Sequence, residues 1–356
     1  MDFASSQHLQ KLLAIDHPII QAPMAGTSTP ALAAAVANAG GLGSISVGAV
    51  DAVTAGGMIA DFRERSNRSL NVNLFCHAPA QAAPAREAAW LARLRPAFAA
   101  AGAAPPAALR EIYKSFVQDD DMLAMLLETR PKVVSFHFGL PAAERIRILR
   151  EAGIILLASA TSPHEAKLAA AAGVHAVVAQ GYEAGGHRGV FDPEAEDAQL
   201  GTLALVSLLA GARDLPVIAA GGLMNGAGIA AVLRLGCAAA QLGTAFIATD
   251  ESAADAGHRA ALFSAAANHT VMTRAISGRP ARCLANRFTA WGADVPAAAI
   301  PAYPIAYDAG KALNAAAMTA GEFGYGAQWA GQGAPLARAL PAAKLMAELV
   351  AELGHS

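Results

Sequence analysis

The feature that most constrains the fold is an alternation of short apolar runs with longer alanine-rich segments along most of the chain. The runs are rich in Val, Ile and Ala and lack polar alternation, which is typical of parallel strands buried on both faces. The predicted strands are 19–22, 43–46, 72–75, 133–136, 154–158, 176–179, 217–219 and 239–242.

The segments between these runs have the signals of helices. Pro30 suits the first turn of a helix, with Thr29 as the residue that caps it. The predicted helices are 30–39, 142–152, 164–172, 202–210 and 226–235. Eight strands alternating with helices predict an α/β fold, a (β/α)8 TIM barrel.

Two segments do not fit this alternation of strands and helices. Residues 76–130 separate the third and fourth strands by far more than one βα connection, and residues 270–356 continue past the eighth unit. We expect both to form a second, mostly helical domain over the C-terminal mouth of the barrel. The barrel would then comprise 1–75 and 131–269. The apolar residues Trp90, Leu91 and Leu94 recur at helical spacing. This pattern predicts an ordered helix in the first segment.

Composition and charge exclude several classes. The chain is 54% hydrophobic and only 15% charged, so it can bury a large core. Lys plus Arg (26) nearly balances Asp plus Glu (28), which removes the usual electrostatic basis for nucleic-acid or membrane binding. Three cysteines lie far apart, and no His/Cys cluster suggests a metal site. Without a secretory signal pattern, we expect a cytoplasmic protein.

Polar and glycine residues follow the predicted strands, at the end of a barrel where active sites gather. Gly221 and Gly222 follow the seventh strand, and the run Gln241, Leu242, Gly243 and Thr244 ends the eighth. Backbone N–H groups at these two positions can approach an anion closely, which predicts a phosphate-bearing cofactor or substrate. Tight βα turns are the alternative explanation for the glycines.

His187 stands in the stretch QGYEAGGHRG after the sixth strand. A lone loop histidine is usually a surface residue, but Gly185 and Gly186 before it permit close approach to a planar ligand. On the catalytic face, such a histidine can take a proton from a carbon acid or bind an anion. Glu183 and Arg188 in this loop are left without a role. The chain lacks the glycine motifs of P-loop, Rossmann and nucleophile-elbow proteins.

The blocks QAPMAG, NVNLF, SFHFG, QGYEAGGHRG, PVIAAGG, QLGTAF and WAGQG occur in that order over nearly the whole chain. Together they resemble the class I nitronate monooxygenases, formerly called 2-nitropropane dioxygenases. Each block alone is weak, because related FMN barrels share several of them, and EAGGHRG is the most discriminating.

The resemblance implies an FMN-dependent barrel with a helical domain over the flavin. It places Pro23 and Met24 beside the flavin, Asn73 and Gln180 on its ring or ribityl chain, and Gly185 against the isoalloxazine. Gly221, Gly222 and Gln241 to Thr244 would hold the FMN phosphate, and His187 matches the catalytic histidine.

The implied reaction is oxidation of an alkyl nitronate, with propionate 3-nitronate as substrate, by flavin and O2 through a flavin semiquinone. The products would be a carbonyl compound and nitrite or nitrate. One alternative is an NAD(P)H-dependent flavin reductase on the same barrel, acting on quinones or an enoyl thioester. Another is a non-catalytic barrel that binds a phosphorylated ligand. The oligomeric state stays open.

Overall fold

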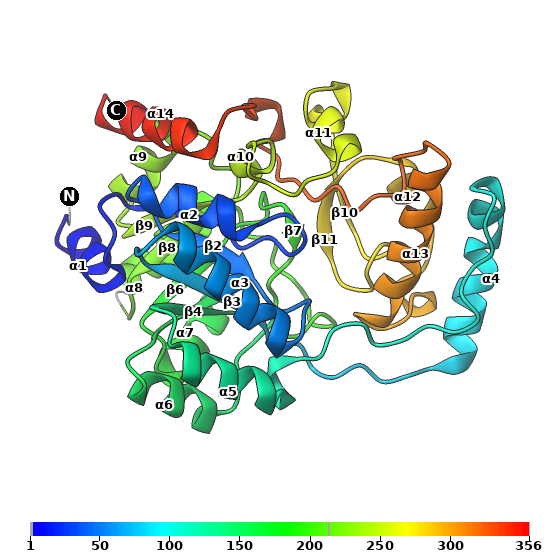
Figure 1. The fold of residues 1–356 in the computed structure, drawn as a ribbon, viewed down its shortest axis with the longest axis horizontal. Coiled ribbons are helices and arrows are strands. Elements are labelled where there is room, and N and C mark those ends of the chain that lie inside the picture. Colours follow the sequence, from blue (N-terminus) through cyan, green and yellow to red (C-terminus); the bar gives the residue numbers. More distant parts are fainter. Residues whose placement is uncertain (1–2, 213, 356) are drawn as a thin grey trace.

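The computed structural model describes residues 3–212 and 214–355, and its centre is an eight-stranded parallel sheet (Figure 1). The sheet order is β1-β9-β8-β6-β5-β4-β3-β2. Its strands are β1 (Ile19–Gln21), β2 (Gly43–Ser46), β3 (Leu70–Phe75), β4 (Val133–His137), β5 (Ile155–Ala160), β6 (Ala176–Gln180), β8 (Val217–Ala220) and β9 (Ala239–Leu242). Gln21 N donates to Leu42 O at 3.0 Å and Leu42 N to Ile19 O at 3.0 Å, which joins the two edges. The predicted (β/α)8 barrel is confirmed.

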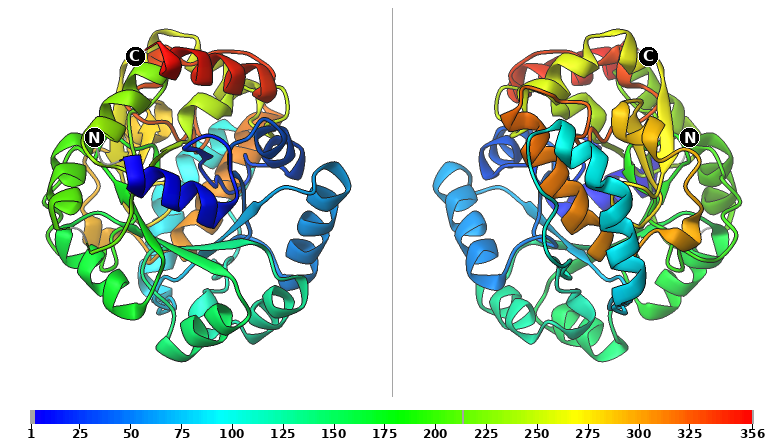
Figure 2. Two further views of the ribbon diagram at one scale, coloured as in Figure 1. Left: turned by 90° about the vertical axis from the view of Figure 1, so that its left-hand side faces the viewer. Right: turned by 90° about the vertical axis from the view of Figure 1, so that its right-hand side faces the viewer.

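Helices surround the strands in a ring, seen end-on in the left view of Figure 2. The ring contains α2 (Pro30–Asn38), α3 (Ala52–Arg65), α5 (Asp120–Thr129), α6 (Ala143–Glu151), α7 (Pro163–Ala172), α8 (Thr202–Ala212), α9 (Gly226–Arg234) and α14 (Ala342–Gly354). The Thr29 hydroxyl accepts from Leu32 N at 3.0 Å, so the predicted cap of α2 is present. Each of the five predicted helices begins and ends within two residues of its expected bounds.

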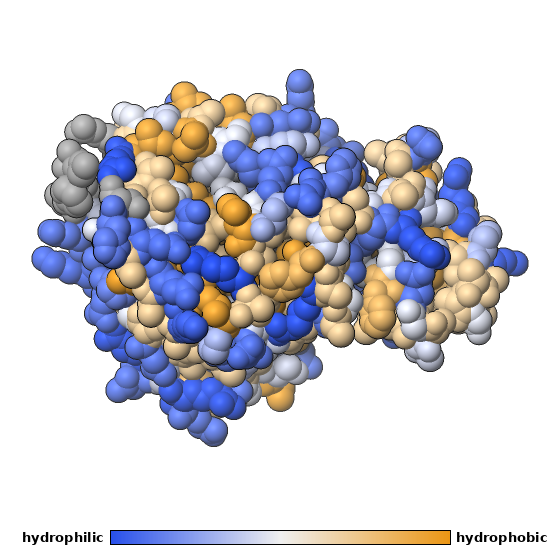
Figure 3. All heavy atoms as spheres, turned by 90° about the horizontal axis from the view of Figure 1, so that it is seen from above, coloured by the Kyte–Doolittle hydropathy of each residue, from blue (hydrophilic) through white to orange (hydrophobic). Residues whose placement is uncertain are grey.

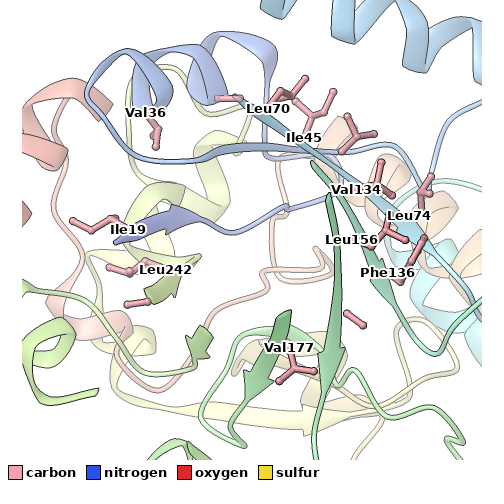
Figure 4. Packing of buried hydrophobic residues seen from close by; sticks show 14 of the residues in the cluster. Ile19, Val36, Ile45, Leu70, Leu74, Val134, Phe136, Leu156, Val177 and Leu242 are labelled. Atoms are coloured by element: carbon pink, nitrogen blue, oxygen red, sulfur yellow. The ribbon is translucent and has the colours of Figure 1, made fainter. Parts of the chain in front are cut away.

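Two hydrophobic layers hold the barrel together. Strand residues such as Ile45, Phe136 and Leu156 face outward and pack against the helices (Figure 4). A second cluster fills the amino-terminal end of the barrel, where α1 (Phe3–Leu13) inserts Leu9 and Leu13, both fully buried. The barrel is therefore closed at its base and open only at the end where the strands terminate.

A second body covers that end. We define the cap as residues 77–115 and 270–333; it contains α4 (Pro84–Ala100), α12 (Arg287–Trp291) and α13 (Ile305–Thr319) (Figure 1). Its own core includes Trp90, which meets Trp291 edge to face at 5.2 Å between ring centroids. The right view of Figure 2 shows α4 and α13 in front of the barrel.

The cap is not wholly helical. Its strands β10 (Thr270–Thr273) and β11 (Ala281–Leu284) form a three-stranded antiparallel sheet with β7 (Gly186–His187). Because β7 belongs to the loop after β6, this sheet fastens the cap to the barrel. Its strands are too short to show a periodicity in the sequence.

Two helices that were expected in the second domain pack on the barrel. Met122 and Leu126 of α5 and Leu345 and Met346 of α14 belong to the main barrel cluster. Thus α5 serves as the barrel helix before β4, and α14 returns from the chain end to cover α2 and α9. The segment inserted over the barrel mouth is therefore shorter than 76–130.

The remaining elements are short. They are α10 (Thr244–Ile247), α11 (Ala256–Leu262) and the 3-10 turns Phe116–Gln118, Ala265–Asn268, Ala297–Ala299 and Ala334–Leu336. Hydrophilic and hydrophobic residues are interspersed on the face shown in Figure 3. Within 3–212 and 214–355, no helix is both long and apolar enough to cross a bilayer.

Candidate active site

A cavity of about 490 Å³ lies between the strand ends and the cap. Residues at the ends of the barrel strands form one wall: Ala22, Ser46, Asn73, Ser135, Ser159, Gln180, Gly221 and Gln241. Cap residues form the opposite wall: Tyr113, Ile276, Tyr303, Tyr307, Lys311 and Trp329. The cavity thus occupies the position at which barrel enzymes bind their ligands.

The structure brings nearly all the predicted site residues to this cavity. Its lining includes Pro23, Met24, Asn73, Gln180, Gly185, His187, Gly221, Gly222, Gln241, Gly243 and Thr244. Leu242 is the exception, because its side chain is 1% exposed and packs in the main barrel cluster. Successive strand residues face opposite sides, so Gln241 faces the cavity and Leu242 faces the helices.

The two predicted amide side chains already have protein partners. Asn73 donates to the Ser135 hydroxyl at 3.0 Å. Gln180 donates to His187 O at 3.0 Å and accepts from Gly189 N at 2.7 Å. Gln180 therefore fixes the loop that carries His187, and its contact with a flavin stays a prediction.

The glycine pair after β8 has a conformation that other residues rarely adopt. Gly221 and Gly222 have φ of +123° and +72°, and a Cβ on Gly221 would lie 2.7 Å from the Thr202 hydroxyl. The Glu183 carboxylate accepts from Thr202 N at 2.8 Å and from its hydroxyl at 2.9 Å, so this acid holds the start of α8. Glu183 is a structural residue that the sequence left without a role.

Arg188 is the second residue of this loop without a predicted role. Its side chain is 2% exposed, and it pairs with Asp197 at 2.7 Å. It also donates to Gln180 O at 2.6 Å. A bidentate pair made by a buried guanidinium holds a loop in place, so Arg188 is a structural residue as well.

The carboxyl-terminal part of the cap crosses the loop before His187. We call residues 329–333 the strap. A Cβ on Gly185 would lie 2.4 Å from Gly331 N, so the close approach at Gly185 is to the strap backbone. Gly331 N donates to the Thr244 hydroxyl and Gln332 N to Glu183 O, each at 2.9 Å. The WAGQG block therefore lies over this loop.

His187 lies within an aromatic cage above the strand ends. Its ring centroid is 5.1 Å from that of Trp329, 5.3 Å from Tyr303, 5.6 Å from Phe138 and 6.0 Å from Tyr307. Its backbone pairs with Ala281 of β11, and its Nε2 lies 2.8 Å from the Ser277 hydroxyl. Strand pairing and a hydrogen bond therefore fix both the backbone and the ring.

Burial lowers the pKa of His187 well below its ordinary value, and the nearby His137, Arg279 and His77 lower it further. The imidazole is consequently neutral at pH 7. Arg279 is 3% exposed and lies 4.3 Å over the Phe138 ring. Burial lowers its pKa to about 10, so its guanidinium remains charged.

A second cation lies at the cap wall. Lys311 lines the cavity, and its Nζ lies 5.0 Å from the Tyr113 ring centroid and 5.6 Å from that of Tyr307. Partial desolvation lowers the pKa of the Lys311 ammonium, against the opposing effect of Asp308. An exposed lysine whose side chain lies over two aromatic rings at the cavity wall is suited to bind an anionic group.

Sequence reasoning missed Ser277, Tyr307 and Lys311. The spacing of Tyr303, Tyr307 and Lys311 at intervals of four was available as a signal, because it places them on one face of α13 and the turn before it. Ser277 had no comparable signal. Among the described residues, no group of three or more His, Cys, Asp or Glu side chains could hold a metal ion.

The barrel and its strand-end cavity define an enzyme of the α/β-barrel class. A model of the nitronate monooxygenase family matches residues 6–352, and the chain belongs to this family; it is an oxidoreductase. The resemblance described above is thereby confirmed, and a non-catalytic barrel is set aside.

The similarity to known relatives and to solved structures extends over nearly the full length of the chain. The chain is 61% identical to a nitronate monooxygenase of Paraburkholderia phytofirmans, over 100% of this chain and 97% of the relative. It is 56% identical to a nitronate monooxygenase of Pseudomonas aeruginosa, over 96% and 98%. The structure of nitroalkane oxidase from Streptomyces ansochromogenes has a TM-score of 0.90 and 43% identity, over 98% of both chains. FabK from Thermotoga maritima has a TM-score of 0.74 and 28% identity, over 98% of this chain and 96% of that one.

Proposed function

We propose that this chain uses FMN and O2 to oxidise alkyl nitronates to a carbonyl compound and nitrite or nitrate. The observation that carries the proposal is the position of His187. It lies within an aromatic cage on a cavity whose other wall is the ring of strand ends. Membership of the nitronate monooxygenase family supports the reaction type.

The cavity fits FMN in size and chemistry. Its volume of about 490 Å³ lies in the range of roughly 300–1,000 Å³ that is usual for small-molecule sites. Gly221, Gly222, Gly243 and Thr244 would hold the phosphate, since a bare backbone can approach it. Pro23 and Met24 line the same wall and would flank the ring. When bound, FMN would supply the electron transfer between nitronate and O2.

The charges around the cavity favour an anionic substrate. A nitronate is an anion, and the neutral His187 cannot balance its charge unless it takes up a proton. Arg279 behind Phe138 and Lys311 at the cap wall supply positive charge instead. His187 is accordingly better suited to orient the nitronate, or to take the α-proton of a neutral nitroalkane.

Lys311 supports propionate 3-nitronate as a substrate. This molecule carries a carboxylate as well as its nitronate group, so it needs two positions of positive potential. Lys311 provides the outer one, on the cap side of the cavity. A nitronate without the carboxylate would lack this second interaction.

The test is oxygen uptake by the FMN-loaded protein with propionate 3-nitronate and no reduced nicotinamide. We expect rapid uptake by the wild type and by His8→Asn, whose exposed residue lies on α1 at the opposite end of the barrel. His187→Asn should be slower by about 10-fold, because the variant loses a hydrogen bond that orients the anionic nitronate. Absence of uptake by the wild type contradicts the proposed reaction, and equal rates for the two variants contradict the role of His187.

A second candidate, an NAD(P)H-dependent flavin reductase, is favoured only by the structural similarity to FabK. Anaerobic mixing with NADH separates the two functions. A monooxygenase of the proposed kind retains its yellow flavin under these conditions, whereas a reductase bleaches it rapidly.

A further inference from the structure

Ser277 is a fully buried residue of the cap whose hydroxyl has three contacts. It lies 2.8 Å from His187 Nε2, 3.2 Å from Arg279 O and 3.4 Å from Arg279 N. The residue is separated from His187 by 90 positions in the sequence. Ser277 is not among the site residues that were expected from the sequence.

The Ser277 hydroxyl has a single proton, which limits how many of these contacts it can make as a donor. A serine hydroxyl has one donor and two acceptor sites. Donation to Arg279 O and acceptance from Arg279 N use one of each, which leaves one acceptor site for His187. If the hydroxyl donated to His187 instead, its contact with Arg279 O would have no proton. The complete set of three hydrogen bonds therefore requires a hydrogen on His187 Nε2.

We propose that Ser277 is a positioning residue that holds His187 as the Nε2–H tautomer, so that Nδ1 carries the lone pair available to substrate. In the part of the chain that the structure describes, no hydrogen bond to Nδ1 is found, while the ring itself lines the cavity. The neighbouring Trp329 and Tyr303 rings restrict rotation of the imidazole. Hydrogen bond and cage together fix which nitrogen can meet a ligand.

The consequence for chemistry rests on the proposed function. With a neutral nitroalkane in the cavity, the α-proton moves to His187 Nδ1, the C–H electron pair becomes the C=N π bond of the nitronate, and the N=O π pair moves onto oxygen. The imidazolium then formed still donates from Nε2 to Ser277. This bond becomes stronger, because a charged donor makes a shorter and stronger hydrogen bond than a neutral one. No oxidation takes place in this step.

Nuclear magnetic resonance of the protein labelled with [15N]histidine tests the tautomer directly, without substrate. His187→Asn identifies the His187 signals among those of the 10 histidines. We expect a neutral ring protonated at Nε2 in the wild type and in Ser277→Thr, which keeps the hydroxyl. Ser277→Ala should give a mixture of both tautomers. A wild-type ring protonated at Nδ1, or an unchanged Ser277→Ala spectrum, overturns the proposal.

Oxygen uptake with nitroethane and with ethyl nitronate separates positioning from a general structural role. Ser277→Ala should lose about 10-fold in the rate with neutral nitroethane, because part of the histidine is in the wrong tautomer and the imidazolium loses a hydrogen bond. The loss with the nitronate, whose acidic proton has already been removed, should be no more than about 3-fold. Equal losses on both substrates overturn the positioning role. A wild type that is inactive on nitroethane but active on the nitronate overturns the base role and leaves the proposed function intact.

A protein inactive on both substrates contradicts the proposed function, while the tautomer is still decided by the resonance experiment. If Ser277→Ala does not fold, Ser277→Cys replaces it, because a thiol is a much weaker hydrogen-bonding group of similar size. The same two readouts then apply.

Discussion

The two walls of the cavity are built in different ways. The barrel wall consists of residues that directly follow parallel strands, so the topology alone brings Asn73, Gln180 and Gln241 to one edge. The cap wall combines Tyr113 with residues from 276 to 329, held together by a separate hydrophobic core and by the small sheet with β7. The barrel wall supplies backbone and amide groups, and the cap wall supplies rings and a cation. Under the proposed function, cofactor binding and substrate selection would belong to different parts of the chain.

The largest effect should come from removing the centre of the cap core. Trp90→Ala deletes a fully buried ring and should destabilise the cap by about 4 kcal/mol. Hydrogen exchange should show lost protection in α4 and α13 with β3 to β6 unchanged. Val53→Ala, at a side chain that is 85% exposed on α3, is the control and should change stability by no more than about 0.5 kcal/mol. Equal loss of protection in the barrel strands means that the two walls unfold as one unit.

Gly185 lies where the barrel wall meets the cap wall, and we expect any side chain at this position to disturb their contact. A methyl group there would overlap the strap backbone, so Gly185→Ala should lower the free energy of unfolding by about 3 kcal/mol and weaken FMN retention. Gly211→Ala is the matched control, because a Cβ there meets nothing within 4 Å. Thermal unfolding and flavin absorbance after gel filtration measure both effects. An unaffected Gly185→Ala protein implies that the strap lies elsewhere in solution.

Within the cap wall, Lys311 should determine substrate preference. Lys311→Met should raise KM for propionate 3-nitronate about 10-fold, as expected for losing about 1.5 kcal/mol from a partly exposed charged interaction. KM for ethyl nitronate should change less than about 2-fold, since this substrate has no carboxylate. Lys311→Arg keeps the charge and should retain most of the preference. Equal effects on the two substrates contradict a carboxylate contact.

The smallest expected effect is a loss of folding stability at low pH, to which one buried histidine of the cap and one of the barrel contribute. Burial lowers the pKa of His77 in the cap and of His137 in the barrel to about 4, from 6.5 in an unfolded chain. As the pH falls below 6.5, the unfolded chain binds protons that the folded chain does not, so stability is lost until the pH reaches about 4.

Each of these histidines should remove about 1 kcal/mol of stability between about pH 7.5 and about pH 5.5. Urea unfolding at the two pH values measures the loss. His77→Phe should reduce it by the contribution of one histidine. A loss of the same size in the variant contradicts a neutral His77 in the folded state.

The parts that could be predicted from the sequence are those with local causes. Buried parallel strands are uninterrupted apolar runs, and Thr29 with Pro30 starts a helix whatever its surroundings, so the barrel follows from short segments. The positions of Gly221, Gln241 and His187 on the cavity then follow from the order of the strands. The roles of these residues toward FMN and substrate stay predictions.

What could not be predicted depends on contacts between distant segments. β7 becomes a strand only because Ala281 and Arg282 pair with it, and Ser277 reaches His187 only through that pairing. Likewise, the apolar face of α14 does not indicate whether it covers the cap or the barrel; α2 and α9 decide this.

The late return of α14 has a consequence for protein synthesis. The last barrel strand, β9, ends at Leu242, but the helix that completes the ring begins at Ala342. At about 5–20 residues per second, a ribosome needs roughly 5–20 s to make the intervening chain. During this interval the apolar sides of α2 and α9 have no cover, and the strap that crosses the cavity does not yet exist. The nascent barrel must therefore avoid aggregation with one flank exposed, and its cavity stays open until residues 329–333 have been made.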